Sequence, residues 1–539
     1  MRGRRSLARV TRAFALAVCA FALWTFARGL AEGQGDPIDA SASDASIEDA
    51  GTSDAGREDA GIADAGVADA GPTGTSLSEV RASAPPVGIV PRLISLVGLA
   101  VMVGLAWLLS LRRDKFPWRL VGWGVGLQLV FGVFVLKTPV GLALFAFLND
   151  VVGALLGFTA DGSRFLFGAY LDSNFTVALN VLPTIIFFSS LMAVLYHLGV
   201  MQKAVRGVAW VMQRTLKTSG AETLSAAANI FVGQTEAPLV VKPFVKDMTM
   251  SELMAVMTGG FATVAGGVLA AYVGMLREHF PDIAGHLIAA SVMSAPASIV
   301  IAKVILPETE EPKTAGTLEL EIEKTHANVI DAAAAGAGEG LTLALNVGAM
   351  LLAFLALVAM VNWLCGLPTT IHNGFVMREL AEAWTARGDA LPDACASADW
   401  IRGYDACARA LDPDASLWAP WTLERMLGYV FWPIAFVMGT PVDDCSAVAA
   451  LLGEKLILNE FVAYSHLSQQ LTELSPRAIV IATYALCGFA NLGSIGIQLG
   501  GIGGMAPERR GDLARIGVRA MLAGTLACFM TACVAGILV

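Results

Sequence analysis

Charged residues are scarce in this sequence, which argues against a soluble globular protein. Only 15% of the 539 residues are Asp, Glu, Lys or Arg, 55% are hydrophobic, and the mean hydropathy is +0.63. Soluble domains typically carry about 25% charged residues. No basic cluster of the kind that contacts nucleic acid is present. The composition therefore predicts a membrane protein that does not bind nucleic acid.

The sequence also lacks the common motifs of enzymes and metal sites. Its eight cysteines include no CxxC pair, and its six histidines show no HExxH spacing. It has no phosphate-binding P-loop and no glycine-rich dinucleotide fingerprint followed by an acid. These absences argue against ATP-driven transport within this chain, and we expect neither an organic cofactor nor catalytic residues.

Changes in composition along the chain predict seven segments. In order they are a signal peptide or signal anchor (1–32), an acidic tail (33–86), an N-terminal transmembrane region (87–219), a first re-entrant hairpin with further apolar helices (220–306), a loop and a further apolar helix (307–365), a polar insertion (366–424), and a second re-entrant hairpin with C-terminal apolar helices (425–539).

The N-terminal leader places the following residues outside the cytoplasm. A basic start, an apolar run and small residues are typical of a signal peptide or an uncleaved signal anchor. The tail repeats Asp-Ala-Gly every five residues, and residues 36–70 hold ten acids and one base. Alanine, glycine and acids offer nothing to bury, so we expect a disordered extracytoplasmic tail. A calcium-binding repeat is the alternative, although the repeat lacks an aliphatic stacking position.

About eight apolar runs reach the roughly 20 residues that cross a bilayer as a helix. We expect them at about 92–111, 120–137, 176–197, 252–275, 285–306, 341–364, 477–500 and 513–538. The loop after the first run carries four cations: Arg112, Arg113, Lys115 and Arg119. The positive-inside rule places this loop in the cytoplasm, which agrees with an exported N-terminus. Residues 138–158 are shorter and Gly-rich, and we interpret them as an interfacial helix.

The polar insertion contains the two cysteines that lie outside apolar runs, Cys395 and Cys407. Disulfides form in oxidising compartments. If the insertion is extracytoplasmic, these two cysteines could form one.

The stretch 222–246 combines apolar flanks with three consecutive polar residues, Gln234, Thr235 and Glu236. Gly233 and Pro238 bracket them, so we expect two half-helices joined at an unwound tip. Such irregular backbone occurs at membrane depth only where protein encloses it or it lines a cavity, and an intramembrane carboxylate indicates a functional site. A satisfied polar network between helices is the alternative.

A second polar, interrupted segment at 437–467 carries Glu460 beside Asn459. Each interrupted segment precedes an apolar span rich in small residues, which is typical of internal repeats around a shared midplane site. In the second such span, Asn491 and Ser494 share a helix face and could bind sugar hydroxyls. Contacts between helices are the alternative role.

Two residues near the first hairpin offer side-chain oxygens for a hard monovalent cation. These are Asn229 and Thr263, and an unwound tip would add backbone carbonyls. The alternative for Thr263 is a hydrogen bond to its own helix, which threonine commonly makes.

Several long motifs, in this order, resemble the concentrative nucleoside transporter family. They are GQTEAPLVVKPF (233–244), FATVAGGVLAAYV (261–273), LIAASVMSAPASIVIAKVILPETE (287–310), NVIDAAAAGAGEGLTLALNV (328–347), LNEFVAYSHL (458–467) and GFANLGSIGIQLGGIGG (488–504). The resemblance runs from about residue 90 to the C-terminus, apart from the insertion. It implies an all-α polytopic membrane protein with about eight transmembrane helices, two re-entrant hairpins, interfacial helices, and an inverted-repeat transport domain beside a scaffold domain in a homotrimer.

The resemblance also implies the site residues. The nucleobase would be bound by Gln234, Thr235, Glu236 and Val268, and the ribose by Glu460, Phe489, Asn491 and Ser494. A sodium ion would be held by Asn229, Val232, Thr263 and Val264. Threonine stands at 263 where the resemblance leads us to expect serine; it keeps the oxygen but crowds the site.

The sequence thus predicts a multi-pass symporter of the cell (inner) membrane that imports nucleosides with sodium by an elevator-like mechanism. Its partners would be nucleosides, membrane lipid and further copies of itself. Proton coupling is one alternative. A membrane enzyme with Glu236 and Glu460 as acid and base, or a channel, are others. The preference for purines or pyrimidines stays open.

Overall fold

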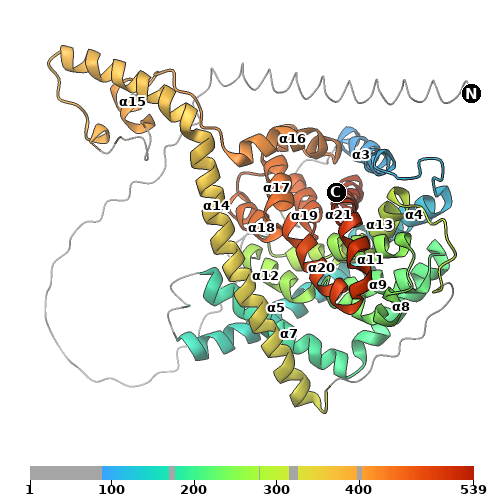
Figure 1. Ribbon diagram of the computed structural model, residues 1–539. Coiled ribbons are helices and arrows are strands. Elements are labelled where there is room, and N and C mark those ends of the chain that lie inside the picture. The colour runs from blue at the N-terminus through green and yellow to red at the C-terminus, as the bar shows by residue number, and fades with distance from the viewer. Residues whose placement is uncertain are drawn as a thin grey trace, which may run out of the picture. The chain divides into compact units, whose positions relative to one another are not determined.

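The structure is a computed structural model that describes residues 88–168, 171, 176–277, 280–314, 326–396, 398 and 404–539. The predicted signal segment and acidic tail lie outside the described residues. Every regular element within the described part is a helix, as Figure 1 shows. The chain divides into two compact units, and the described residues of the smaller one belong to Pro368–Pro420. The larger unit comprises Gly74–Leu367 and Trp421–Val539.

Eight stretches of the described chain are helical, long and apolar enough to cross a membrane, in agreement with the predicted fold class. The first half of the larger unit contains α3 (Ile89–Leu108), α4 (Trp118–Lys137), α5 (Pro139–Phe167), the π-helical η1 (Val177–Val181), α7 (Leu182–His197) and α8 (Val200–Leu216). Helix α5 is longer than expected, with 29 residues where we predicted a short interfacial helix, and its length and composition suffice for a span.

The first interrupted segment forms the predicted hairpin in place of one continuous helix. It consists of α9 (Gly220–Asn229), a non-helical tip, the 3₁₀ turn η2 (Ala237–Val241) and α10 (Lys242–Val245). A capping box starts α9, because Ser219 and Glu222 each bond to the other's backbone N–H. Pro238 stands in the first turn of η2, where a missing N–H is tolerated.

An interrupted helix follows the hairpin. Helix α11 (Met250–Ala262) starts with a second capping box, between Thr249 and Glu252. It ends at Thr263, whose backbone is extended, and α12 (Gly266–Leu276) continues the span. Helix α13 (Ile283–Ile305) comes next and is buried along almost all its length.

The second half of this unit repeats the order of hairpin and interrupted helix. After α16 (Leu423–Val437), the second hairpin is α17 (Cys445–Ile457) and α18 (Glu460–Gln469), joined at Leu458 and Asn459. The interrupted helix is α19 (Pro476–Leu486) and α20 (Leu492–Met505), and the chain ends with η4 (Pro507–Arg509) and α21 (Arg510–Leu538). The repeat expected from the sequence is therefore present.

The apolar run predicted as a span at 477–500 is not a single helix, because the chain leaves the helical conformation between α19 and α20. Gly488 has φ +156° there. A Cβ on this glycine would lie 2.8 Å from the carbonyl oxygen of Phe261 and 2.9 Å from that of Ala262. The interruption thus brings the backbone against the end of α11, and only glycine permits that approach.

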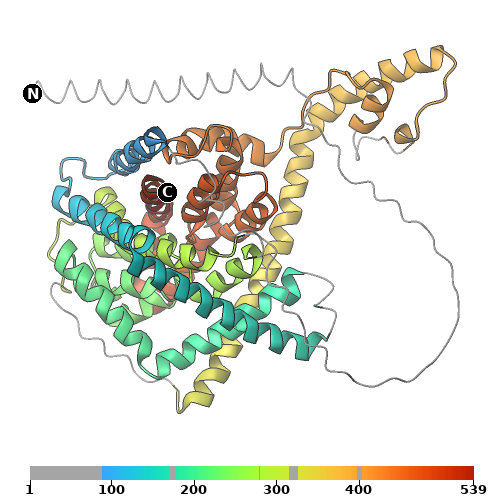
Figure 2. The ribbon, with the colours of Figure 1, turned by 180° about the vertical axis from the view of Figure 1, so that it is seen from behind.

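Helices α11, α13 and α21 pack on one another and form the buried centre of the larger unit. Figure 2 shows the same helices from behind, with α3 and α4 on the outside. Helix α3 packs on α21, and α4 packs on α13. Far fewer residues are buried in α3, α4, α5, α7 and α14 (Val329–Ala386) than in this centre, as expected for helices that face lipid or another chain.

The smaller unit contains the disulfide that the sequence left open. Helix α14 (Val329–Ala386) runs into this unit, which also holds η3 (Asp393–Cys395) and α15 (Asp405–Leu411). Cys395 and Cys407 are bonded. The Asn373 side chain connects three parts of this unit. Its amide nitrogen donates to the Asp405 carboxylate at 2.8 Å and to the Trp418 carbonyl at 3.0 Å, and its amide oxygen accepts from the Trp418 N–H at 2.9 Å.

Candidate substrate and ion site

A chain of buried hydrogen bonds joins the two hairpins through α20. The Gln234 amide in the first hairpin donates to Ser494 Oγ at 3.2 Å. The N–H of Ser494 donates to Asn491 Oδ1 at 2.8 Å, so Asn491 caps α20. Asn491 Nδ2 donates to Glu460 Oε2 at 3.0 Å. Four of the predicted nucleoside-binding residues therefore meet in one network.

Glu460 has a second partner that our sequence analysis missed. The Tyr272 hydroxyl on α12 donates to Glu460 Oε1 at 2.9 Å, and both side chains are buried. Tyr272 lies one turn after Val268 on the same face of α12, which places that predicted residue beside the network. The i,i+4 spacing of Val268 and Tyr272 was the signal in the sequence that could have identified the tyrosine.

Gln498 is the other residue that the sequence analysis missed. Its amide donates to Gln234 Oε1 and to the Met257 carbonyl, both at 3.1 Å. It lies one helical turn after Ser494 on α20, so an extension of the i,i+3/i+4 pattern from Asn491 would have found it. Gln498 therefore orients the Gln234 amide and ties it to α11.

The remaining predicted nucleoside-binding residues lie around this network. Thr235 packs its methyl group against α20, because a Cβ on Gly501 would lie 2.8 Å from Thr235 Cγ2. The Glu236 side chain is exposed at the hairpin tip and folds back over Gly233. Phe489 lies in the interruption between α19 and α20 and is buried.

The two side chains predicted to bind the cation converge on Gly259 in α11. A Cβ on Gly259 would lie 3.1 Å from Asn229 Nδ2, so the amide packs directly on this glycine. The Thr263 hydroxyl donates to the Gly259 carbonyl at 2.8 Å, which is the helix bond we had considered as its alternative role. Asn229 Oδ1 is buried and has no hydrogen-bond partner among the described residues. An unpartnered buried amide oxygen suits a hard cation.

Two backbone carbonyls at the tip of the first hairpin, next to this cluster, accept hydrogen bonds from neighbouring helices. Ser291 Oγ donates to the Ile230 carbonyl at 3.1 Å, and the N–H of Gly266 donates to the Phe231 carbonyl at 3.2 Å. Val232 follows directly, and Val264 lies in the α11–α12 interruption; both are buried. Their backbone carbonyls therefore belong to the two unwound segments that flank Asn229 and Thr263.

A backbone hydrogen bond links the segment that carries Thr263 with the segment that carries Phe489. The N–H of Phe489 donates to the Thr263 carbonyl at 3.4 Å. The two interrupted helices thus touch where each loses its helical bonds. Among the described residues, no three His, Cys, Asp or Glu side chains are grouped as metal ligands.

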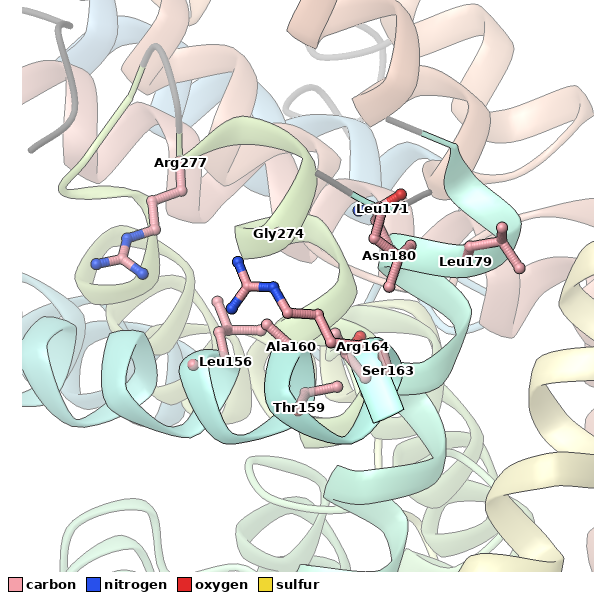
Figure 3. Close-up of a pocket in the computed structure, with 12 residues that line it drawn as sticks. Leu156, Thr159, Ala160, Ser163, Arg164, Leu171, Leu179, Asn180, Gly274 and Arg277 are labelled. Carbon is pink, nitrogen blue, oxygen red and sulfur yellow. The ribbon is translucent and has the colours of Figure 1, made fainter. Parts of the chain in front are cut away.

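A separate cavity of about 300 Å³ opens between α5, η1, α7 and α12, and Figure 3 shows its lining. Arg164 and Arg277 contribute cations, and Asn180 contributes an amide from η1. None of the predicted site residues lines this cavity.

Comparison with known proteins identifies the family. Three family models match this chain. Their descriptions are "Na+ dependent nucleoside transporter N-terminus" (residues 97–170), "Nucleoside recognition" (178–278) and "Na+ dependent nucleoside transporter C-terminus" (286–536). The uncharacterized transporter YutK of Bacillus subtilis is 41% identical over 450 residues, which cover 82% of this chain and 98% of YutK. The chain belongs to the concentrative nucleoside transporter family.

Other members of the concentrative nucleoside transporter family are longer. The sodium/nucleoside cotransporter 1 of Mus musculus is 40% identical over 463 residues, covering 83% of this chain and 64% of the mouse protein. Solute carrier family 28 member 3 of Eptatretus stoutii is 39% identical, with 60% of its length covered. This chain thus spans less than two thirds of these vertebrate relatives.

Solved structures of one family member, CNTnw, share the fold. The inward-facing, substrate-bound state is 39% identical and covers 83% of this chain and 98% of CNTnw, with a TM-score of 0.68. A CNTnw variant in an outward-facing state is 40% identical with a TM-score of 0.70, covering 84% of this chain and 98% of the variant. CNTnw and its variant thus represent an inward-facing and an outward-facing state.

Proposed function

We propose that this protein imports nucleosides, coupled to sodium, by moving the two hairpins and two interrupted helices as one transport unit. The observation that carries this proposal is the buried network from Gln234 through Ser494 and Asn491 to Glu460. It joins both halves of the repeat and offers donors and acceptors side by side. Such groups are expensive at membrane depth and favour a polar, largely uncharged ligand.

The division of labour within the site follows from the chemistry of each half. An amide presents a donor and an acceptor in one plane, so Gln234, with Thr235, Glu236 and the apolar Val268, suits a nucleobase. Glu460 uses one bond per oxygen for Tyr272 and Asn491 and retains further lone pairs. We assign Glu460, Asn491, Ser494 and Phe489 to the ribose.

Sodium coupling is supported by the cluster at Gly259. Asn229 and Thr263 supply the side-chain oxygens, and the Val232 and Val264 carbonyls complete the proposed set. The Phe489–Thr263 backbone bond gives ion and ribose a shared segment. Coupling requires that both ligands stabilise the same arrangement. One charge moving through 100 mV contributes about 2.3 kcal/mol, equivalent to about fortyfold accumulation.

We further propose a homotrimer in the cell (inner) membrane, with the acidic tail and the insertion outside the cytoplasm. The Cys395–Cys407 disulfide supports an oxidising location for the insertion. Exposed leucines along α14 and α5 support burial against lipid or another copy of the chain.

Uptake of radiolabelled uridine and adenosine into proteoliposomes tests the transport proposal. We expect accumulation of the intact nucleoside with an inward sodium gradient. Glu460→Gln should raise KM by about ten- to a hundredfold, because a charged acceptor contributes about 1.5–3 kcal/mol. The exposed Glu473→Gln is the matched control. A chemically altered product would favour an enzyme, and equilibration without accumulation would favour a channel.

A pair of variants at one position tests sodium binding. Thr263→Val removes the hydroxyl, whereas Thr263→Ser keeps it. We expect the valine variant to need at least tenfold more sodium for half-maximal uptake, and the serine variant to stay within about threefold, because a lost ligand costs at least about 1.4 kcal/mol. Uptake driven by a proton gradient, with no dependence on sodium in choline replacement, would replace sodium with protons as the coupling ion.

A further inference from the structure

Helix α8 has one basic face and no acid. Residues Val200–Lys217 contain four cations and neither Asp nor Glu. The cations are Lys203, Arg206, Arg214 and Lys217, and all four are exposed. The opposite stripe, Met201, Val205, Met212 and Leu216, is buried. The helix is thus strongly amphipathic, and every charge on its exposed side is positive.

An aromatic residue lies on the exposed side among these cations. Trp210 is 55% exposed, and the Arg214 guanidinium lies 4.2 Å from the centre of its ring. Tryptophan is enriched at the level of lipid headgroups, because its ring is apolar and its N–H is polar. Trp210 therefore suits a position in an interface between lipid and water.

Contacts of the residues that follow α8 show where its C-terminus lies in the larger unit. The N–H of Gly220, just after α8, donates to the Thr314 carbonyl at 2.9 Å. Glu222 pairs with Lys303 near the end of α13, and the Ile305 carbonyl accepts from Leu111. Leu111 begins the cationic loop that the positive-inside rule assigns to the cytoplasm. The C-terminal end of α8 therefore lies on the cytoplasmic side.

Both ends of α8 turn sharply. Gly199 before it has φ 77°, and Lys217 after it has φ 54°, the only positive φ of a non-glycine residue in the described chain. Left-handed residues at both ends let a helix leave the direction of its neighbours. Figure 2 shows α8 along the periphery of the larger unit, between α7 and the first hairpin.

We propose that α8 lies in the cytoplasmic leaflet and that its basic face binds anionic phospholipid headgroups. Because the apolar stripe of α8 packs against the protein, the side that meets lipid carries the four cations and Trp210, and attraction to anionic headgroups supplies the binding. Each cation near an anionic surface is worth about 1 kcal/mol, or roughly a fivefold change in association. Anionic lipid would thereby hold α8, the helix that leads into the first hairpin, at the membrane surface.

Quenching of Trp210 by brominated lipids tests this proposal in proteoliposomes that contain the full chain. The Trp210 signal is obtained by subtracting the fluorescence of Trp210→Phe. At equal mole fraction, brominated phosphatidylglycerol should quench Trp210 several-fold more than brominated phosphatidylcholine. The preference should weaken in high salt, which screens charges at this surface.

The double variant Lys203→Gln/Arg206→Gln should remove most of this several-fold lipid preference, because each lost charge weakens association with an anionic surface by up to about fivefold. The control variant Arg378→Gln/Arg387→Gln removes two exposed cations in the insertion and should leave it unchanged. Equal quenching by both lipids, or a preference that survives the double variant, would overturn the proposal. Failure of both lipids to quench would also overturn it and would indicate that another protein surface covers α8.

Discussion

Gln234 is oriented by two partners that come from distant parts of the chain. Ser494 accepts from its amide nitrogen, and Gln498 donates to its amide oxygen. A side-chain amide can flip between two nearly isosteric orientations, and these two bonds select one of them. The orientation of Gln234 decides whether a donor or an acceptor faces the proposed nucleobase. Gln498 is therefore a positioning residue.

Replacing Gln498 should weaken substrate binding without abolishing folding. Gln498→Leu keeps the volume but removes the donor to the Gln234 amide oxygen and the bond to the Met257 carbonyl. Loss of one buried hydrogen-bond partner costs about 1–3 kcal/mol. We expect KM for nucleosides to rise about tenfold with kcat changed less, measured by initial uptake rates.

The exposed Gln469→Leu serves as the control for this prediction. Gln498→Glu is a second variant, because it retains the length of the side chain but lacks the amide donor, and KM should rise as in Gln498→Leu. A KM within twofold of wild type in Gln498→Leu would show that Gln498 does not orient the site.

Lys303 ties the starts of the first hairpin and α11 to the end of α13. Its ammonium contacts Glu222, Ser251 and Glu308. Glu222 caps α9, and Ser251 lies in the first turn of α11. Each helix start thus shares a partner with α13, so these elements are expected to move together.

Glu308 makes this connection sensitive to pH. Burial alone raises the pKa of Glu308, but Lys303, the N–H of Glu310 and the Thr249 hydroxyl hold it below its ordinary value of 4.5. A lowered pKa in the folded state means that the carboxylate stabilises the protein above its ordinary pKa. That stabilisation is lost as the pH falls through the lower, folded-state value.

Glu308→Gln should therefore lower the thermal unfolding temperature at neutral pH. The difference from wild type should narrow as the pH falls below about 4.5. The measurement is differential scanning fluorimetry of the purified protein between pH 3.5 and 7.5. Glu310→Gln, an exposed neighbour, is the control. A difference that does not depend on pH would mean that Glu308 acts through packing and not through its charge.

The Cys395–Cys407 disulfide should stabilise the insertion but should not be needed for transport. Cys395 and Cys407 close a loop of 12 residues, which corresponds to about 3 kcal/mol in the chain-entropy description. Cys395→Ser/Cys407→Ser should speed proteolysis within the insertion several-fold and leave nucleoside uptake within twofold. Limited proteolysis followed by mass spectrometry measures the first effect.

Cys365→Ser is the control, because Cys365 is a free cysteine in the structure. Loss of uptake in a double variant that still elutes as a monodisperse protein would assign the insertion a part in transport. The predicted domain boundaries would then need revision around residue 366.

The local sequence was sufficient to predict the helices and interruptions that are caused by neighbouring residues. The apolar runs predicted about eight spans, and Gly233 with Pro238 predicted the interruption of the first hairpin. The apolar pattern did not predict the interruption between α19 and α20, because its cause is distant: Gly488 approaches the carbonyls of Phe261 and Ala262. Helix periodicity within 477–500 carries no trace of that approach.

For the whole molecule, the sequence by itself determined the membrane class, the repeat of hairpin and interrupted helix, and the polar residues of the candidate site. Only the tertiary structure decided which of these residues are hydrogen-bonded to each other and which additional partners, such as Tyr272 and Gln498, they have. Hydrophobicity and chain-breaking residues act over one or two helical turns and can be read locally. The partnership of Tyr272 with Glu460 spans 188 positions, and it exists only because packing brings α12 and α18 together.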